Sequence, residues 1–251
     1  MKVTLIGAGP GDAELMTIKG MKRLQQADVV LYDRLVGTEI ISMIPESAEK
    51  ICVGKHASRH PVPQEEIGRL LLSRAKQGLH VVRLKGGDPF IFGRGGEELE
   101  ILAENNIPFE VIPGVSSSIA AGAYAGIPLT HRDYSSSLHI ITGHAQKNGE
   151  LDIDFKSLTQ MKGTIVILMS VATLEKICVR FLDAGMDEAT PAAVVENATL
   201  ENQRTIIGTL GTIFELSQRY HLVSPAVVVL GKVCDLSRKL DWFTLSPEDR
   251  M

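Results

Sequence analysis

Short apolar runs alternate with longer amphipathic stretches along the first half of the chain. The apolar runs are rich in β-branched residues and are typical of buried strands, whereas the longer stretches have the spacing of helices. Strands are predicted at 3–7, 27–33, 50–54, 80–87 and 109–114. Helices are predicted at 14–26, 36–44, 64–77, 95–105 and 116–126. This alternation predicts an α/β fold with a parallel sheet covered by helices on both faces.

The rhythm breaks at "GIPLTHRDYSSS" (126–137), which is rich in polar residues and is predicted to be a linker. A second α/β set follows it. Its strands are predicted near 138–142, 164–169, 191–196, 203–207 and 226–231, and its helices near 173–184 and 210–219. The chain is therefore predicted to form two α/β domains, 1–130 and 131–251, with the active site in the cleft between them.

Composition limits the classes of partner. The 251 residues carry a formal net charge of −4 and are 44% hydrophobic, which is typical of a globular protein and disfavours a dedicated nucleic-acid binder. No apolar run is long enough for a membrane span, and the N-terminus has no secretory pattern. Cys52, Cys178 and Cys234 are isolated, which favours reduced thiols. We expect a cytoplasmic protein with neither a nucleic acid nor a membrane as its partner.

The first predicted strand ends in "GAGPGD" (7–12), which partly matches a dinucleotide-binding turn. Gly7 and Gly9 occupy the first two glycine positions, and Asp33 ends the second strand, where a ribose-binding acid would lie. However, Asp12 replaces the third glycine, and Pro10 has no N–H to offer a pyrophosphate. The turn favours a ligand without phosphates, or a cationic one. A dinucleotide site and a purely structural turn are the alternatives.

A second glycine-rich stretch, "RLKGGDPFIFGRGGEE" (83–98), follows another predicted strand. Gly86 and Gly87 permit close approach of a ligand, and Asp88 can hydrogen-bond its own turn. Two glycine pairs in one loop favour a functional loop over a structural one. Like "GAGPGD", this loop leaves the carboxyl end of a strand, where open α/β sheets bind ligands.

A third turn, "PGVSSS" (113–118), belongs to the same predicted edge, where Ser116 and Ser117 cap the next helix or bind a ligand carboxylate. Basic residues gather in or beside these loops, and such a cluster suits a polyanionic small molecule. The basic residues are Lys55, His56, Arg59, His60, Arg83, Lys85, Arg94, His131 and Arg132. His56 and His60 have i,i+4 spacing, but Pro61 and the lack of a third ligand disfavour a metal site.

These motifs together resemble the uroporphyrinogen-III C-methyltransferases of the tetrapyrrole methylase family, including the methyltransferase portion of sirohaem synthase. The resemblance runs from about residue 2 to residue 243. It is carried by "GAGPGD", "ADVVLYDRLV", "VGKHASRHPVPQEEI", "VVRLKGGDPFIFGRGGEE", "IPGVSSSIAA", "YAGIPLTHRDY", "ITGH" and "SRKLDWF".

The resemblance implies a tetrapyrrole methylase fold that binds S-adenosylmethionine (SAM), forms a homodimer and needs no metal. The implied reaction is methylation of uroporphyrinogen III at C2 and C7, which gives precorrin-2 and S-adenosylhomocysteine for sirohaem, cobalamin or haem d1 biosynthesis. The dehydrogenase/chelatase portion of sirohaem synthase has no counterpart in this sequence, so we expect a monofunctional methyltransferase.

The resemblance also implies residue roles. A proton acceptor matches Asp33 and a proton donor matches Lys55, with Arg94 as a third candidate for the proton transfer. The implied SAM contacts are Pro10, Gly86, Gly87, Asp88, Ile91, Ser116, Ser117, Thr130, Met169 and Ala198. The implied substrate contacts are Lys55, Arg94, Glu97 and Arg132. Two positions depart from the family, since Ser170 and Ala198 stand where glycine is common.

Other readings of the same residues make different predictions. A nicotinamide-dependent oxidoreductase would bind NAD(H) saturably, and a non-catalytic module would bind SAM or a tetrapyrrole without producing S-adenosylhomocysteine. Later precorrin methylases and diphthine synthase share the fold, but the unbroken "RLKGGDPFIFGRGGEE" and "PLTHRDY" blocks favour the uroporphyrinogen enzyme.

Overall fold

A computed structural model describes residues 2–54, 63–146 and 149–243. The chain divides into two compact units, Met1–Ser116 and Ser117–Met251. Both units combine one five-stranded sheet with helices, in agreement with the predicted α/β class. Within the described ranges, no helix is both long and apolar enough to cross a membrane.

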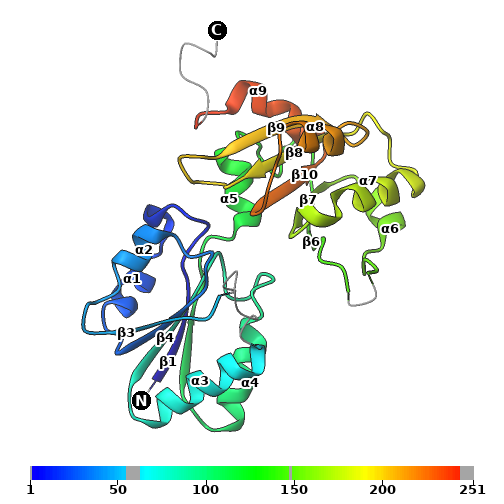
Figure 1. Cartoon of the computed structure of the whole chain (residues 1–251). Coiled ribbons are helices and arrows are strands. Elements are labelled where there is room, and N and C mark those ends of the chain that lie inside the picture. Colours follow the sequence, from blue (N-terminus) through cyan, green and yellow to red (C-terminus); the bar gives the residue numbers. More distant parts are fainter. Residues whose placement is uncertain (1, 55–62, 147–148, 244–251) are drawn as a thin grey trace. The chain divides into compact units, whose positions relative to one another are not determined.

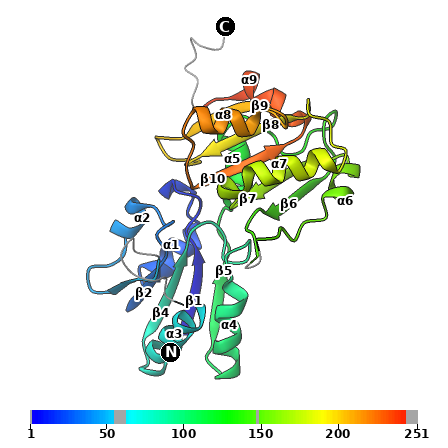
Figure 2. The ribbon, with the colours of Figure 1, turned by 45° about the vertical axis from the view of Figure 1, so that its right-hand side comes forward.

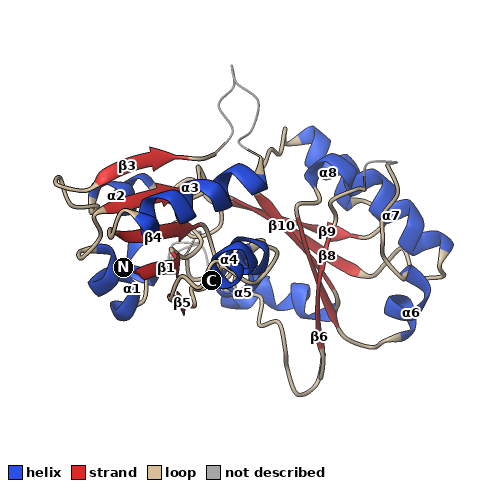
Figure 3. Cartoon of the chain, turned by 90° about the horizontal axis from the view of Figure 1, so that it is seen from below, coloured by secondary structure: helices blue, strands red, loops and turns tan. Residues whose placement is uncertain are grey.

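The sheet of the first unit is wholly parallel and has the strand order β3-β2-β4-β1-β5. Figure 3 shows β3, β4, β1 and β5 in that order across the sheet. The strands are β1 (Lys2–Gly7), β2 (Val29–Tyr32), β3 (Glu49–Cys52), β4 (His80–Lys85) and β5 (Phe109–Ile112). Each strand corresponds to a predicted one, although most end earlier because the glycine-rich turns begin there.

Helices cover both faces of this sheet, as the alternating pattern predicts (Figure 1). Its helices are η1 (Ala13–Leu15), α1 (Ile18–Leu24), α2 (Thr38–Ser42), α3 (Gln64–Lys76) and α4 (Gly95–Glu104). Side chains of β1 alternate between the two faces, since Ile6 packs with α1 and α2 while Val3 and Leu5 pack with α3 and α4. On the face toward α3 and α4, β4 places two charged residues, Arg83 and Lys85.

The sheet of the second unit is mixed, with the order β6-β7-β10-β8-β9. Only β6 and β7 pair in parallel, while the other pairs are antiparallel. The strands are β6 (Leu138–Thr142), β7 (Thr164–Leu168), β8 (Pro191–Glu196), β9 (Arg204–Thr209) and β10 (Ala226–Leu230). All five were predicted within a few residues.

The helices of the second unit also lie on both faces of their sheet. Residues of α6, α7 and α8 pack on one face, as Figure 2 shows for α7, whereas α5 and η3 pack on the other. The helices are α5 (Ser117–Tyr124), α6 (Phe155–Gln160), η2 (Val171–Thr173), α7 (Leu174–Asp183), α8 (Ile213–Arg219), η3 (Lys232–Leu236) and α9 (Ser237–Leu240). The short helices α6, η2, η3 and α9 were not predicted, because each is too brief to show helical periodicity.

Helix α5 belongs to the second unit, although the sequence places the domain boundary after residue 130. Ala121 and Ala125 are fully buried and pack with Val166, Val227 and Val229 of the second sheet. The small apolar face of α5 therefore forms part of the second core. The break in amphipathic rhythm at 126–137 lies beyond this helix and marks a turn within the second unit.

Candidate active site

Three glycine-rich loops meet at the carboxyl ends of β1, β4 and β5, as the sequence predicts. Gly9 and Gly87 exchange two backbone hydrogen bonds, with N···O distances of 3.2 and 2.6 Å. A Cβ on Gly7 would lie 2.5 Å from the nitrogen of Gly114 and 2.7 Å from the carbonyl oxygen of Gly87. These loops require glycine because their backbones touch, so the edge presents main chain with few side chains.

Asp88 joins the second loop to the third. Its Oδ1 accepts hydrogen bonds from the backbone nitrogens of Phe90 (2.8 Å) and Ile91 (3.2 Å), and its Oδ2 accepts one from Gly114 (3.0 Å). The carboxylate thus turns the chain and fixes the loop that carries Ile91, whose side chain is exposed. Further along this loop, Phe92 has a positive φ of 52°, a strained conformation for a bulky residue.

The first loop does not have the chemistry of a pyrophosphate site. Asp12 caps η1, since its Oδ1 accepts a hydrogen bond from the backbone nitrogen of Glu14 at 2.8 Å. A negative charge therefore lies where a dinucleotide would place its phosphates, and Pro10, which is half-buried, offers no N–H. The turn therefore suits a ligand without phosphates, or a cationic one.

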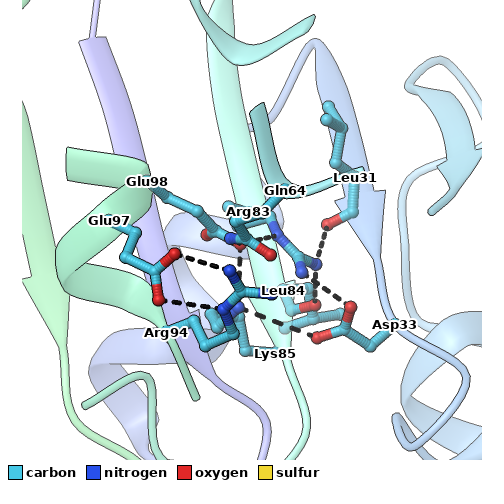
Figure 4. Close-up of polar contacts among 9 residues, drawn as sticks. All are labelled: Leu31, Asp33, Gln64, Arg83, Leu84, Lys85, Arg94, Glu97 and Glu98. Atoms are coloured by element: carbon cyan, nitrogen blue, oxygen red, sulfur yellow. Dashed lines mark hydrogen bonds and ion pairs between the residues drawn. The ribbon is translucent and has the colours of Figure 1, made fainter. Parts of the chain in front are cut away.

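A network of ion pairs lies beside these loops (Figure 4). Arg83 and Lys85 occupy alternate positions of β4, so both side chains point to the face covered by α3 and α4. Arg83 donates from Nη2 to Asp33 Oδ1 at 2.6 Å and from Nε to Glu98 Oε1 at 3.2 Å. Lys85 Nζ lies 2.9 Å from Glu98 Oε1 and 4.0 Å from Asp33 Oδ2. Asp33 follows β2 directly. Because β2 pairs in parallel with β4, this position lies beside the end of β4.

Burial distinguishes the members of this network. The side chains of Arg83, Lys85 and Glu98 are 2%, 5% and 0% exposed, whereas that of Asp33 is 29% exposed. Burial, together with the neighbouring charge of Arg83, lowers the pKa of Lys85. Asp33 is therefore the member that a ligand can reach, and the other three hold it from behind.

Arg94 and Glu97 form a separate pair on the solvent side of α4. Arg94 Nε and Nη2 donate to the two carboxylate oxygens of Glu97 at 2.9 and 2.6 Å. This two-point hydrogen bond raises the pKa of Arg94 and lowers the pKa of Glu97. Arg94 has a positive φ of 57° at the start of α4, and both side chains are more than half exposed. Both are accessible to an acidic ligand.

The second unit holds the remaining candidates. Ser117 begins α5, Thr130 and Arg132 are exposed around a turn, and Met169 is exposed at the end of β7 with a φ of 53°. Ala198 lies in the turn after β8 and is buried. Ser116 is buried at the end of the first unit. The structure thus divides the predicted SAM contacts between the two units.

The two departures from the family are compatible with the backbone. Ala198 lies between Asn197 and Thr199, which have φ values of 49° and 75°, but it does not itself adopt a positive φ. Thr199 is held there by a hydrogen bond from its nitrogen to Gln203 Oε1 at 2.8 Å. Ser170 has a φ of −107°, which any residue adopts. Neither position requires glycine.

The predicted proton donor, Lys55, lies outside the described residues, as do His56, Arg59 and His60. Glu98 has no role that the sequence motifs predict, and Arg83 and Lys85 are predicted only as members of a basic cluster. The signal was available, because a central strand that reads "HVVRLK" buries its side chains and so needs counter-charges from elsewhere.

The parallel sheet with glycine-rich loops at its carboxyl edge, followed by a mixed α/β unit, is the arrangement to compare with known proteins. The family described as Tetrapyrrole (Corrin/Porphyrin) Methylases matches residues 2–213, and the chain belongs to this family.

Named relatives agree with that assignment. The chain is 56% identical over 245 residues to porphyrin biosynthesis protein HemD of Ruminiclostridium josui, a match that covers 98% of this chain and 49% of that protein. It is 49% identical over 244 residues to a siroheme synthase of Chromobacterium violaceum, with 97% and 52% covered. The chain spans about half the length of these curated relatives.

A solved structure resembles most of the chain. It is a uroporphyrin-III C-methyl transferase of Thermus thermophilus, complexed with S-adenyl homocysteine. The two share 39% sequence identity with a TM-score of 0.81, and the match covers 94% of this chain and 100% of that one.

Proposed function

We propose that the chain transfers methyl groups from SAM to C2 and C7 of uroporphyrinogen III, giving precorrin-2 and S-adenosylhomocysteine. The observation that carries this proposal is the likeness to the Thermus thermophilus enzyme, because it covers that enzyme's whole chain and that enzyme is a uroporphyrin-III C-methyl transferase complexed with S-adenyl homocysteine. The family assignment and the loop chemistry support the same reaction class.

The glycine loops suit SAM as the methyl donor. Gly86, Gly87 and Asp88 form a turn after β4 that two backbone hydrogen bonds between Gly87 and Gly9 hold in place, and the exposed Ile91 and the half-buried Pro10 would offer apolar contact. The second unit would add Ser117, Thr130, Met169 and Ala198, with Ser116 at the junction. When bound, SAM supplies a methyl group on a sulfonium, which is already activated for transfer. The protein is left mainly with placing the acceptor carbon, and orientation of this kind is worth roughly 7–11 kcal/mol.

Asp33 is proposed as the base of the reaction. Methylation of a pyrrole carbon leaves a positive charge on the ring, and the ring must lose a proton to become neutral again. Asp33 is partly exposed, and Arg83 holds its Oδ1 in place at 2.6 Å, so that Oδ2 is available to accept this proton. Lys55 is proposed as the proton donor of the same site, and Arg94 as a further participant.

Charged side chains are proposed to hold the substrate. Uroporphyrinogen III carries eight carboxylates, so cations at the loop edge favour its binding, and Arg94, Arg132 and Lys55 are the residues proposed. Arg94 is preoriented by Glu97 through two hydrogen bonds. Glu97 in turn offers acceptors for the pyrrole N–H groups of the macrocycle.

We further propose that the chain acts as a homodimer in the cytoplasm, with no nucleic-acid or membrane partner, and that its product feeds sirohaem, cobalamin or haem d1 biosynthesis. The net charge of −4 disfavours a nucleic-acid partner, and the names of the curated relatives support a role in porphyrin and sirohaem biosynthesis. Light scattering after gel filtration tests the dimer. A mass of about 27.3 kDa in solution would contradict it, because that is the mass of one chain.

A methyl-transfer assay tests the reaction itself. The protein is incubated anaerobically with SAM and enzymatically prepared uroporphyrinogen III, and S-adenosylhomocysteine is counted against methyl groups gained. Binding of SAM measured separately by calorimetry distinguishes a wrong substrate from a wrong cofactor. Saturable NAD(H) binding without SAM binding would favour an oxidoreductase instead.

A further inference from the structure

In the buried part of the charge network, one side chain, Arg83, contacts both carboxylates at once. Charge pairing alone does not require this geometry. The guanidinium of Arg83 uses every nitrogen: Nε to Glu98, Nη2 to Asp33, and Nη1 to the carbonyl oxygens of Leu84 (3.1 Å) and Leu31 (3.4 Å). These contacts lie around one rigid plane, so the position of Nε fixes the position of Nη2. The carboxylate on α4 is thereby coupled to the carboxylate that follows β2.

We propose that Glu98 is a positioning residue that acts through Arg83 to hold Asp33 in the orientation needed to accept a proton. The inference rests on the proposed function, since it assigns Glu98 a part in the same reaction. Glu98 lies behind Asp33, is fully buried and touches no ligand-accessible surface.

The hydrogen bonds of Glu98 are unequal. Its Oε1 accepts from Arg83 Nε, from Lys85 Nζ and from Gln64 Nε2 at 2.8 Å. Within the described part of the chain, its Oε2 is buried and has no hydrogen-bond partner. The carboxylate is therefore held through one oxygen, and glutamine can keep that oxygen while removing the charge. Glu98→Gln separates the electrostatic anchor from the shape of the side chain.

The charges of the network also balance. Two cations from β4 face Glu98 from α4 and Asp33 from the end of β2, and Gln64 at the start of α3 adds a neutral donor. Without the Glu98 charge, two buried cations would share Asp33 as their only anion within the described network. Arg83 would then move toward one optimal contact, and Asp33 would lose its defined orientation.

A double-mutant cycle tests the inference. Glu98→Gln is expected to lower kcat for methyl transfer roughly 10- to 100-fold, with the KM for the tetrapyrrole and the Kd for SAM changed less than about 2-fold. Asp33→Asn lowers kcat directly. If Glu98 acts through Asp33, adding Glu98→Gln to Asp33→Asn has little further effect. Glu100→Gln is the matched control, because Glu100 is an exposed residue of the same helix.

The outcomes separate the inference from the proposed function. If the wild type methylates uroporphyrinogen III and the two losses multiply in the double mutant, Glu98 acts independently of Asp33 and the inference is wrong. If the wild type transfers no methyl group, the proposed function fails and the inference fails with it. Should Glu98→Gln not fold, Arg83→Lys replaces it, because lysine keeps the buried cation but lacks the rigid guanidinium plane that fixes one carboxylate relative to the other. A wild-type kcat in Arg83→Lys would overturn the coupling.

Discussion

At the scale of single residues, the site separates accessible charges from buried ones. Arg94 and Glu97 are exposed and touch each other, whereas Arg83 and Glu98 are buried and hold Asp33. The first pair can change partners when an acidic ligand arrives, and the second cannot without leaving a buried charge unpaired. The exposed pair is therefore suited to binding and the buried pair to positioning.

Replacing Arg94 with alanine tests the binding assignment. We expect the KM for the tetrapyrrole to rise roughly 10- to 100-fold, since a charge-assisted hydrogen bond to a carboxylate is worth about 1.5–3 kcal/mol. The affinity for SAM, measured by calorimetry, should stay near the wild-type value.

The control is Arg69→Ala, because Arg69 is an exposed residue of α3 whose partner Glu65 lies one turn away. If Arg94→Ala lost SAM binding and kept tetrapyrrole binding, Arg94 would bind SAM and the proposed assignment would be wrong. Unchanged kinetics would remove it from the site.

Many residues of the candidate site could be predicted from the sequence. Which carboxylate pairs with which cation could not. Asp33 and Arg94 were singled out from the motifs that contain them. Glu98 was not, because the sequence places it beside Glu97 in one acidic pair and does not show which of the two is buried. That depends on helical phase: Glu98 points from α4 to the sheet while Glu97 points to solvent.

At the scale of elements, the glycine loops are packed backbone to backbone. Their positions follow from the strand ends, and the sequence predicts them because glycine pairs directly follow β-branched runs. The contacts of Gly7 with Gly87 and Gly114 could not be predicted, since they depend on the order of β4, β1 and β5 in the sheet.

Gly7→Ala tests this packing. A Cβ there would meet three backbone atoms at 2.5–2.7 Å, so the loops must separate. We expect a loss of about 1–3 kcal/mol in the free energy of unfolding and a marked loss of SAM affinity. Gly96→Ala is the control, since a Cβ on Gly96 meets nothing within 4 Å and alanine favours the helix. Denaturant unfolding decides the matter, and equal stability of the two variants would contradict the packing.

Glu110 links β5 to β1 and to α1 through ion pairs. Its carboxylate lies 2.5 Å from Lys2 Nζ on β1, and 2.6 and 3.1 Å from Lys19 Nζ and Arg23 Nε on α1. Hydrogen bonds from Lys19, Lys2 and Arg23 lower the pKa of Glu110 from 4.5 to about 2. The charged partners of Glu110 belong to β1 and α1 and not to the glycine-rich loops, so we expect its effect to be on stability.

Glu110→Gln is expected to lower the free energy of unfolding by about 1–2 kcal/mol at pH 7. Because the pKa is lower in the folded state, the carboxylate stabilises the fold above pH 4.5, and this contribution is lost as the pH falls toward 2. The difference between wild type and variant should therefore be smaller at pH 3 than at pH 7. Urea unfolding at both values measures it, with Glu104→Gln as an exposed control. An equal difference at both pH values would show that the ion pairs do not stabilise the fold.

At the scale of the whole molecule, the sequence predicts two α/β units, and the structure contains them. The strand directions of the second unit were not predicted, since apolar runs look alike in parallel and antiparallel sheets. The short connection between β8 and β9, residues 197–203, was a usable signal, because a parallel pair needs a longer crossover. Helix α5 could not be assigned to its unit from the sequence, because its small apolar face fits either core.

We propose above all that this tetrapyrrole methylase acts on uroporphyrinogen III. The most direct measurement is an anaerobic incubation with SAM and freshly made uroporphyrinogen III, followed by oxidation and mass spectrometry of the tetrapyrrole. We expect a gain of two methyl groups, with two molecules of S-adenosylhomocysteine formed for each macrocycle. An unmethylated tetrapyrrole recovered from protein that still binds SAM would contradict it.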